Sequence, residues 1–366
     1  MEKVNLGDVC ERGPSNIAQK DIINNDGVYP IYGASGIIKY VDFYTQENEY
    51  IAIVKDGAGI GRTMILPAKS SIIGTMQYIF PKKNIYVRYL YYAIKSMNLA
   101  KYYSGVTIPH IYFKDYQKEQ LYLPGLDMQK KIVQKLDKIQ EIIDIREKQL
   151  EQLDKLIKSQ FVEMFGEATK NEKMFPVVNI GDRCFVTKLA GFEYSKYIDY
   201  KDSGDVIMVR GLNVKNQRLK LDDVYYIEQS VSDSLPRSQL KCGDICMTYV
   251  GINIGDVALV DNMNNYHLAP NVAKISINDI NEINPQFFVY LLAYNKSNFA
   301  SNATNTAKQA LNMERIRKLS VMLPPIDLQN KFALIVEQID KQKFEIQKSL
   351  EEMQLLQESL MNKYFG

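Results

Sequence analysis

A seven-residue motif occurs twice in this chain, at an interval of 200 residues. LPGLDMQ occupies Leu123–Gln129, and LPPIDLQ occupies Leu323–Gln329. Around the motif, residues 121–166 align without gaps with residues 321–366 and match at 13 of 46 positions. Two further pairs of segments correspond in the same order: VNLGDVC (4–10) with VNIGDRC (178–184), and GAGIG (57–61) with GINIG (251–255). The chain is therefore predicted to contain two copies of one unit, each a variable domain followed by a similar tail.

The two tails have the hydrophobic spacing of a coiled coil. Intervals of four and three residues alternate along each tail, and the phase is the same in both over five heptads. This spacing predicts a long helix with an apolar seam. The polar seam members fall at different places in the two tails, which either favours one register or reflects tolerated substitutions. The seam positions are Ile132, Leu136, Ile139, Ile143, Arg146, Leu150, Leu153, Ile157, Gln160 and Met164, and Phe332, Val336, Ile339, Lys343, Ile346, Leu350, Met353, Gln357, Leu360 and Tyr364.

The seam also predicts how the tails pair. A helix over Met128–Phe165 would be about 55 Å long, at about 1.5 Å per residue. A lone helix would leave its seam in water and lose about 1.5–3 kcal/mol for each large side chain that is not buried. The other tail is the obvious partner. Because the first tail leads from one domain to the next, the second must run back along it. The pair is therefore expected to be antiparallel, with a globular domain at each end and Gly366 close to Met1.

Composition restricts the class of protein. The chain has 366 residues, of which 46% are hydrophobic and 24% charged, so at least two folded domains are expected. The first ten residues contain no apolar signal region, and no apolar run reaches the roughly 20 residues that span a bilayer. Four cysteines are too few for a disulfide framework. Together these features favour a cytoplasmic protein. The net charge of +2 is nearly neutral, so DNA binding must rest on local patches.

With the two copies, the segment YPIYGASGIIKYVDFY (Tyr29–Tyr44) and the paired LPxhDhQ helix starts, where h is apolar, the chain resembles the DNA specificity subunit of type I restriction-modification systems. The resemblance implies an α+β fold with two globular α/β target-recognition domains. These are separated by two long antiparallel helices that form a coiled coil, in a pseudo-two-fold, near-circular arrangement. The corresponding boundaries are 1–124 and 167–324 for the recognition domains, and 125–166 and 325–366 for the spacer helices.

The resemblance also implies the partners. Each recognition domain would read half of a split target in double-stranded DNA, and the helices would set the gap and dock two methyltransferase subunits. Restriction and translocase subunits would join for cleavage. This chain itself would bind no cofactor and no metal and would not be catalytic. S-adenosylmethionine would belong to the methyltransferase partner, and ATP and Mg to the restriction partner.

Divergence between the two variable domains predicts two unlike half-sites around an unread gap. Two readers on a rigid spacer can address sites about one helical turn apart, roughly 34 Å from centre to centre. Changing the length of the spacer is then expected to change the gap and not the half-site sequences.

Candidate DNA contacts in the first domain lie in three segments. The turn-like YGASGIIKY supplies Tyr32, Ser35 and Lys39, and the alternative is a tight turn without contacts. KDGAGIGRT lacks the Gly-Lys-Ser/Thr ending of a phosphate loop, so a glycine-rich hairpin is favoured, flanked by Lys55 and Arg62. Residues 82–118 carry seven basic side chains among tyrosines, with Lys82, Lys83 and Lys101 as candidate phosphate contacts, followed by Thr107 and His110. A helix with core tyrosines and solvated lysines is the alternative for this stretch.

Candidate contacts in the second domain are fewer. Thr248 and Asn253 flank the second glycine segment, and Arg210 precedes it. The polar stretch over residues 295–318 supplies Asn305, Thr306, Lys308 and Gln309, since Asn and Gln can read adenine and Thr can meet a thymine methyl or a phosphate. A solvated loop is the alternative there.

Two other classes of protein compete with this interpretation. A single-chain amino-methyltransferase would need an Asn/Asp-Pro-Pro-Tyr/Phe motif, and LPPI at residue 323 has neither the polar head nor the aromatic. A coiled-coil scaffold would explain the tails but not the two large, diverged domains. CGDIC (242–246) is no zinc signature, and Cys10 and Cys184 look like small core residues at equivalent positions.

Overall fold

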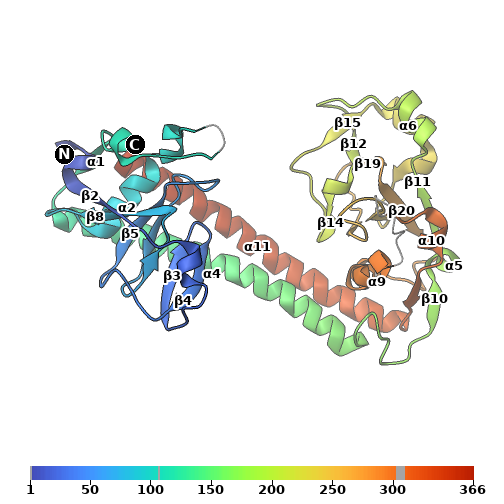
Figure 1. Cartoon of the computed structure of the whole chain (residues 1–366). Helices are drawn as coiled ribbons and strands as arrows, with labels where there is room; N and C mark the ends of the chain where they lie inside the picture. The colour runs from blue at the N-terminus through green and yellow to red at the C-terminus, as the bar shows by residue number, and fades with distance from the viewer. Residues whose placement is uncertain (1, 106–107, 302–309) are drawn as a thin grey trace. The chain divides into compact units, whose positions relative to one another are not determined.

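The computed structural model describes residues 2–105, 108–301 and 310–366, without the side chains of residues 300 and 301. The chain divides into two compact units (Figure 1). The first comprises Met1–Gln149 and Ile346–Gly366, and the second comprises Leu150–Glu345. Each unit therefore contains a globular domain together with part of both long helices. The four domain boundaries expected from the sequence stay a prediction.

The first unit is built from short strands and one covering helix. A four-stranded antiparallel sheet has the order β2-β8-β5-β6, and a smaller sheet has the order β4-β3-β7. The elements are β1 (Glu2–Asn5), α1 (Leu6–Val9), β2 (Cys10–Pro14), η1 (Gln19–Ile22), β3 (Tyr29–Gly33), β4 (Gly36–Val41), β5 (Tyr50–Val54), β6 (Thr63–Leu66), β7 (Ser71–Ile72), β8 (Met76–Pro81), α2 (Val87–Ser96), η2 (Leu99–Tyr102), α3 (Phe113–Tyr116), β9 (Gln120–Leu123) and α4 (Leu126–Phe165).

Strand β5 contributes side chains to two of the core clusters of the first unit. All five residues of YIAIV are buried, and successive side chains point to opposite faces of the sheet. Ile51 and Ile53 join one cluster with α2, and Tyr50 and Val54 join another beneath the smaller sheet. The tyrosines of α2 that are buried, Tyr89 among them, belong to the core, which is the alternative that the sequence left open for them.

The second unit repeats this plan with longer connections. Its elements are β10 (Val177–Asn179), α5 (Ile180–Arg183), β11 (Cys184–Lys188), α6 (Gly191–Tyr197), β12 (Val206–Val209), η3 (Gly211–Asn213), β13 (Val214–Lys215), β14 (Gln217–Leu219), β15 (Tyr225–Ile227), α7 (Gln229–Ser234), η4 (Pro236–Ser238), β16 (Gln239–Leu240), β17 (Ile245–Thr248), β18 (Val257–Leu259), β19 (Asn265–Leu268), β20 (Val272–Ile277), α8 (Pro285–Tyr294), α9 (Lys296–Ser301), α10 (Met313–Arg317), β21 (Ser320–Met322) and α11 (Ile326–Phe365).

Strand pairing makes the structural repeat explicit. β3 pairs antiparallel with β4 and parallel with β7, and β12 pairs in the same way with β15 and β19. β1 pairs antiparallel with β9 just before α4, and β10 pairs with β21 just before α11. Cys10 and Cys184 begin equivalent strands and are buried, as predicted, and burial raises the pKa of each thiol to about 12. The predicted two-copy α+β fold is therefore confirmed.

The units differ most after β3 and β12. In the first unit only Ala34 and Ser35 separate β3 from β4. In the second unit, η3, β13 and β14 are inserted between β12 and β15, and the β13–β14 hairpin extends the larger sheet to the order β11-β20-β17-β18-β14-β13. Arg218 of this hairpin forms an ion pair with Asp340 of α11. The insertion is thus tied to the long helix of its own unit.

The two long helices carry the predicted seam. Each spans 40 residues, and all twenty predicted seam positions are buried or half-buried. In the first unit, Gln357 donates to Gln140 over 2.9 Å, and the ring of Phe365 lies 5.1 Å from that of Tyr89. In the second unit, Lys343 donates to Asp154 over 2.5 Å. Further along the helices, Ile132 shares a core cluster with Tyr364 in the first unit, and the rings of Phe161 and Phe332 lie 5.4 Å apart in the second. Within each unit a step forward on α4 is thus matched by a step back on α11, so the predicted antiparallel pairing is confirmed.

The end of α11 packs against the first domain. Leu360, Met361 and Phe365 contact the core cluster that contains Leu6 and Tyr89. The C-terminus therefore returns to the unit in which the chain begins, as the sequence predicted, while Met1 itself lies outside the described residues.

The repeated motif ends in a buried glutamine that forms three hydrogen bonds to the backbone. The side chain of Gln129 is fully buried, accepts a hydrogen bond from Tyr86 N at 2.8 Å, and donates to Asn84 O and Pro124 O at 3.0 and 2.8 Å. Gln329 does the same in the second unit, accepting from Asn284 N at 2.9 Å and donating to Glu282 O and Pro324 O at 3.0 and 2.7 Å. Each glutamine joins the start of a spacer helix to the loop that begins α2 or α8.

Lys343 provides a test of the seam. It occupies a seam position, yet its ion pair with Asp154 is largely exposed on the aspartate side, and such pairs contribute about 0–1 kcal/mol. Replacing Lys343 with leucine is expected to raise the free energy of unfolding by about 1 kcal/mol, because an apolar side chain there is half-buried. Urea unfolding measures the change. Destabilisation by Lys343→Leu would mean that the ion pair, and not the seam, is what matters at this position.

Candidate nucleic-acid interface

Three segments of the first unit meet at one place, which we name the first loop cluster. They are the β3–β4 turn (Ala34–Ser35), the glycine loop (Lys55–Arg62) and the described part of residues 103–112. Arg62 Nη1 donates to Ala34 O over 2.6 Å, Gly57 N donates to Pro109 O over 2.9 Å, and Ile111 N donates to Lys55 O over 2.9 Å. The turn, the hairpin and the segment that were picked out separately in the sequence are thus neighbours.

The glycine loop closes a β-hairpin, as predicted, between β5 and β6. Val54 N donates to Arg62 O, and Gly61 N donates back to Val54 O, both over 2.9 Å. Gly61 has φ of +81°, and a Cβ atom there would lie 2.6 Å from the backbone nitrogen of Ala100. Glycine is therefore required both for the left-handed backbone and for close packing against η2.

Asp56 organises the charges of this cluster. Its Oδ2 atom accepts a hydrogen bond from Lys55 Nζ, and its Oδ1 atom lies 2.7 Å from His110 Nδ1. Burial alone would raise the pKa of Asp56, but the hydrogen bonds and charges of Lys55 and His110 outweigh it and hold that pKa below its usual value. The carboxylate therefore stays ionised and orients both Lys55 and His110. No pattern in the sequence marks Asp56.

Among the described residues of the first unit, two exposed cations lie at the rim of the glycine loop. Arg62 uses one of its five N–H donors on Ala34 O, which leaves the others for a ligand. Lys95 lies over the Tyr91 ring at 5.8 Å and, with Arg62 and Asn98, lines a groove of about 530 Å³ between the loop and residues 95–100. Lys95 belongs to the basic stretch of the sequence, but only the tertiary structure places it beside the glycine loop.

The other predicted basic contacts lie elsewhere or are engaged. Lys39 Nζ donates to Ile22 O and Ile23 O at 3.2 and 2.7 Å and pairs with Asp26 at 2.9 Å. Lys101 pairs with Glu119 at 2.5 Å. Lys82 donates to Gly7 O over 2.9 Å, and the neighbouring Lys83 is exposed. Both residues follow the end of β8 that lies away from the glycine loop, about 17 Å along the strand. Tyr32 is half-buried and Ser35 exposed at the turn.

The second unit contains a second loop cluster with the same backbone bonds. Thr248 N donates to Asp256 O, Gly255 N donates to Thr248 O, and Leu311 N donates to Tyr249 O, each over 2.9 Å. These bonds correspond one for one to those of Val54, Gly61 and Ile111 in the first unit. The side chains differ, however, because Tyr249, Asp256 and Ala310 stand where the first cluster has Lys55, Arg62 and His110.

The residues of the second unit that were predicted to contact DNA differ in their exposure. Asn253 is half-exposed in the glycine loop, but Thr248 is only 2% exposed. Arg210 stacks over Tyr225 at 4.4 Å and donates to Asp223 Oδ1 over 2.8 Å, so it braces the loop after β12. Thr107, Asn305, Thr306, Lys308 and Gln309 lie outside the described residues. The role of each predicted residue in DNA binding stays a prediction.

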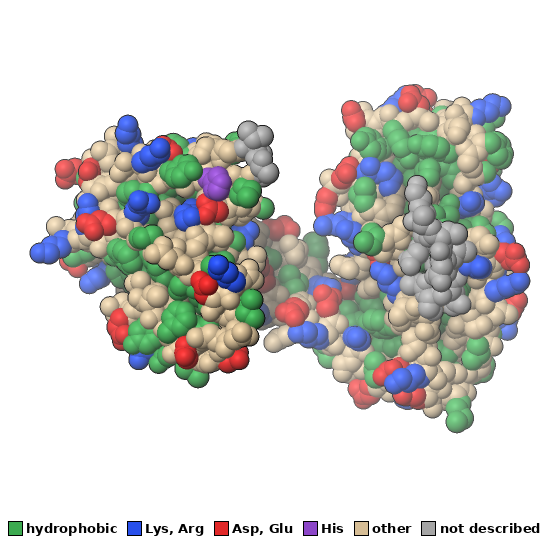
Figure 2. Space-filling view, viewed as in Figure 1, with side chains coloured by type: hydrophobic (Ala, Val, Ile, Leu, Met, Phe, Trp, Pro, Cys, Tyr) green, Lys and Arg blue, Asp and Glu red, His purple; other side chains and the backbone are tan. Residues whose placement is uncertain are grey.

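Charges of both signs are mixed on the face of each unit that Figure 2 shows. Over residues 2–105, 108–301 and 310–366, no helix is long and apolar enough to cross a bilayer, and no group of three or more His, Cys, Asp or Glu side chains could hold a metal ion. The candidate contacts to DNA are the exposed cations at the loop clusters, Arg62 among them.

Arg62 and Lys39 allow this to be tested with matched changes. Arg62→Gln is expected to reduce the salt dependence of DNA binding by about one phosphate contact, a slope change of about 0.9, because the guanidinium is exposed at the loop rim. Lys39→Gln is expected to leave the slope unchanged, because the ammonium of Lys39 is held by two backbone carbonyls and by Asp26. Binding of the chain to duplex DNA at several salt concentrations measures both. Equal slopes for Arg62→Gln and the wild type would place the interface elsewhere.

Comparison with known proteins agrees with this geometry. A family model described as type I restriction modification DNA specificity domain matches residues 1–155 and 172–355. The chain therefore belongs to the family of type I restriction-modification DNA specificity domains.

Two curated relatives and one solved structure illustrate the likeness. The chain is 23% identical to the type I restriction enzyme MjaVIII specificity subunit of Methanocaldococcus jannaschii, over 99% of this chain and 91% of that one. It is also 23% identical to the EcoBI specificity subunit of Escherichia coli, over 72% and 61% of the two chains. The crystal structure of a type I restriction-modification S subunit from M. genitalium has a TM-score of 0.67 at 14% identity, covering 100% of this chain and 96% of the other, which supports the fold.

Proposed function

We propose that this chain is the DNA-recognition subunit of a type I restriction-modification assembly, in which each unit reads one half of a split, asymmetric target. One observation carries the proposal. The same hairpin backbone is built twice, with matching hydrogen bonds, but it presents Lys55, Arg62 and His110 in one unit and Tyr249, Asp256 and Ala310 in the other. A repeated scaffold with different side chains is what two readers of unlike half-sites require.

The assembly would supply the chemistry that this chain lacks. In this proposal, two methyltransferase subunits bind S-adenosylmethionine, and restriction and translocase subunits use ATP and Mg, in the cytoplasm where the DNA is accessible. The chain itself would be non-catalytic, in keeping with its family. The length of the helical spacer would set the gap between the half-sites.

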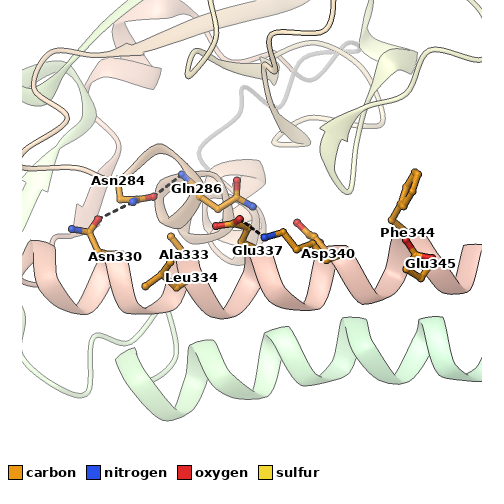
Figure 3. A pocket seen from close by; sticks show the side chains of 10 residues that line it. Asn284, Gln286, Asn330, Ala333, Leu334, Glu337, Asp340, Phe344 and Glu345 are labelled. Carbon is orange, nitrogen blue, oxygen red and sulfur yellow. Dashed lines mark hydrogen bonds and ion pairs between the residues drawn. The ribbon is translucent and has the colours of Figure 1, made fainter.

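A surface for a methyltransferase subunit is available on α11. A groove of about 830 Å³ lies between the start of α8 and α11, lined by Asn284, Leu334 and Phe344 among others (Figure 3). Leu334 and Phe344 are 60% and 68% exposed, and Phe344 projects from α11 on the side away from α4 (Figure 3). Exposed apolar side chains on a seam-forming helix favour a protein partner there.

Methylome sequencing tests the proposal. The chain is co-expressed with its methyltransferase partner in a host that lacks both, and the complex is co-purified to establish assembly. The expected result is one split, asymmetric methylated motif. Exchanging residues 55–62 for the same loop of a relative with a different target is expected to change one half of the motif only. A continuous motif, or simultaneous change of both halves, would contradict the proposal.

A further inference from the structure

The side chain of Ile252, at the tip of the second glycine loop, is exposed to solvent. Ile252 is 98% exposed, more than any other large apolar side chain among the described residues. Ile254, two residues on, is only 3% exposed and joins the core. The loop therefore buries one isoleucine and presents the other.

The backbone holds Ile252 in this position. Ile254 N donates to Gly251 O over 3.3 Å, and Asp256 N donates to Asn253 O over 3.0 Å, so the tip is bonded on both sides. Gly251 and Gly255 have φ values of +97° and +84°, which an isoleucine would rarely adopt. No atom lies within 4 Å of a Cβ atom built on Gly251, so the tip faces open space.

An ion pair and an exposed cation lie at the base of the same loop. Lys296 packs beneath Gly255, where a Cβ atom would meet its Cγ at 3.0 Å, and its ammonium is 2.5 Å from Asp256. The exposed Lys188 lies over the Tyr249 ring at 5.3 Å. An apolar tip near the exposed Lys188 suits DNA, because a cation contacts phosphate while an apolar side chain meets the C5-methyl group of thymine in the major groove.

We propose that Ile252 is a specificity-determining residue of the second half-site and contacts the C5-methyl group of a thymine. The inference rests on the proposed function and extends it to one chemical group of the target. At the equivalent place the first loop has Ala58, also exposed, whose single methyl group reaches less far. The two units therefore differ in their reach toward a thymine methyl.

Uracil supplies the probe, because it pairs as thymine does but lacks the methyl group. In the assembled methyltransferase complex, each thymine of the second half-site is replaced in turn by uracil and kcat/KM for methylation is measured. One replacement is expected to lower kcat/KM of the wild type about fourfold, the factor that burial of one methyl group provides. Ile252→Ala is expected to be at least about fourfold slower on the thymine duplex and indifferent to that replacement.

Met263→Ala is the matched control. Met263 is 77% exposed and lies beyond the other end of β18, away from the glycine loop, so this variant is expected to keep the full uracil penalty of the wild type. Ile252→Val, which keeps the branched methyl groups, is expected to keep most of it. Unchanged thermal unfolding of Ile252→Ala would show that the fold is intact.

Three results would overturn the inference alone. They are a second half-site without thymine, a half-site in which no uracil replacement matters, and a uracil penalty that persists in Ile252→Ala. A wild-type assembly that methylates no split target would instead overturn the proposed function, and the inference with it.

Discussion

Replacing Gln129 with leucine is expected to lower the free energy of unfolding of the first unit by about 3–5 kcal/mol. The fully buried amide serves Tyr86 N, Asn84 O and Pro124 O, and leucine would leave these three backbone groups without their partner. Each buried group that loses its hydrogen bond costs about 1–3 kcal/mol. A loss of this size is a large fraction of the 5–15 kcal/mol that typically stabilises a domain.

Urea unfolding and hydrogen exchange measure the effect at two levels. The amide of Tyr86 is expected to exchange faster in Gln129→Leu, because its acceptor is gone. Gln134→Leu, an exposed glutamine on the same helix, is expected to change stability by less than about 0.5 kcal/mol. Gln329→Leu is expected to have the same effect on the second unit. Wild-type stability in both variants would show that the repeated motif has another purpose.

Replacing Gly61 with valine is expected to abolish recognition of the first half-site. The residue has φ of +81°, and a Cβ atom would lie 2.6 Å from Ala100 N, a backbone atom that cannot move aside as a side chain can. A left-handed backbone costs a residue with a Cβ atom about 1–2 kcal/mol, and the clash adds to this. The total cost is about 2–4 kcal/mol, which would lower the population of the binding-competent loop at least about 30-fold. The rate of methylation is expected to fall by the same factor.

Gly57→Ala separates the contribution of packing from that of strain. Gly57 also has a positive φ, +91°, but a Cβ atom there would meet nothing within 4 Å. This variant is expected to lose about 1–2 kcal/mol of loop stability and to retain part of its activity. Methylation kinetics and DNA binding by the assembled complexes distinguish the two variants. Equal activity of Gly61→Val and the wild type would mean that the first glycine loop does not contact DNA.

The candidate site was predicted in its parts and not in its arrangement. The glycine segments, His110 and Arg62 are visible in the sequence because glycine, histidine and flanking cations mark a loop with a polar surface. Asp56 was missed, since one acid next to a lysine is ordinary until His110 is placed 2.7 Å away. Lys39 and Arg62 look alike in the sequence, but Lys39 bonds to the backbone of its own unit, and Arg62 keeps most of its donors exposed. Only long-range contacts distinguish them.

The sequence by itself determined the two-copy plan and the antiparallel helices, because a heptad seam and a 200-residue repeat are periodic, and periodicity is written in neighbouring residues. It also indicated which segments form hairpin loops. Only the tertiary structure decided which charges are free, why Gln129 and Gln329 end the repeated motif, and that Ile252 stands in solvent while Ile254 is buried. The physical reason is that burial and hydrogen bonding depend on contacts between residues far apart in the chain, such as Lys55 with Ile111 and Tyr249 with Leu311, and no local pattern encodes them.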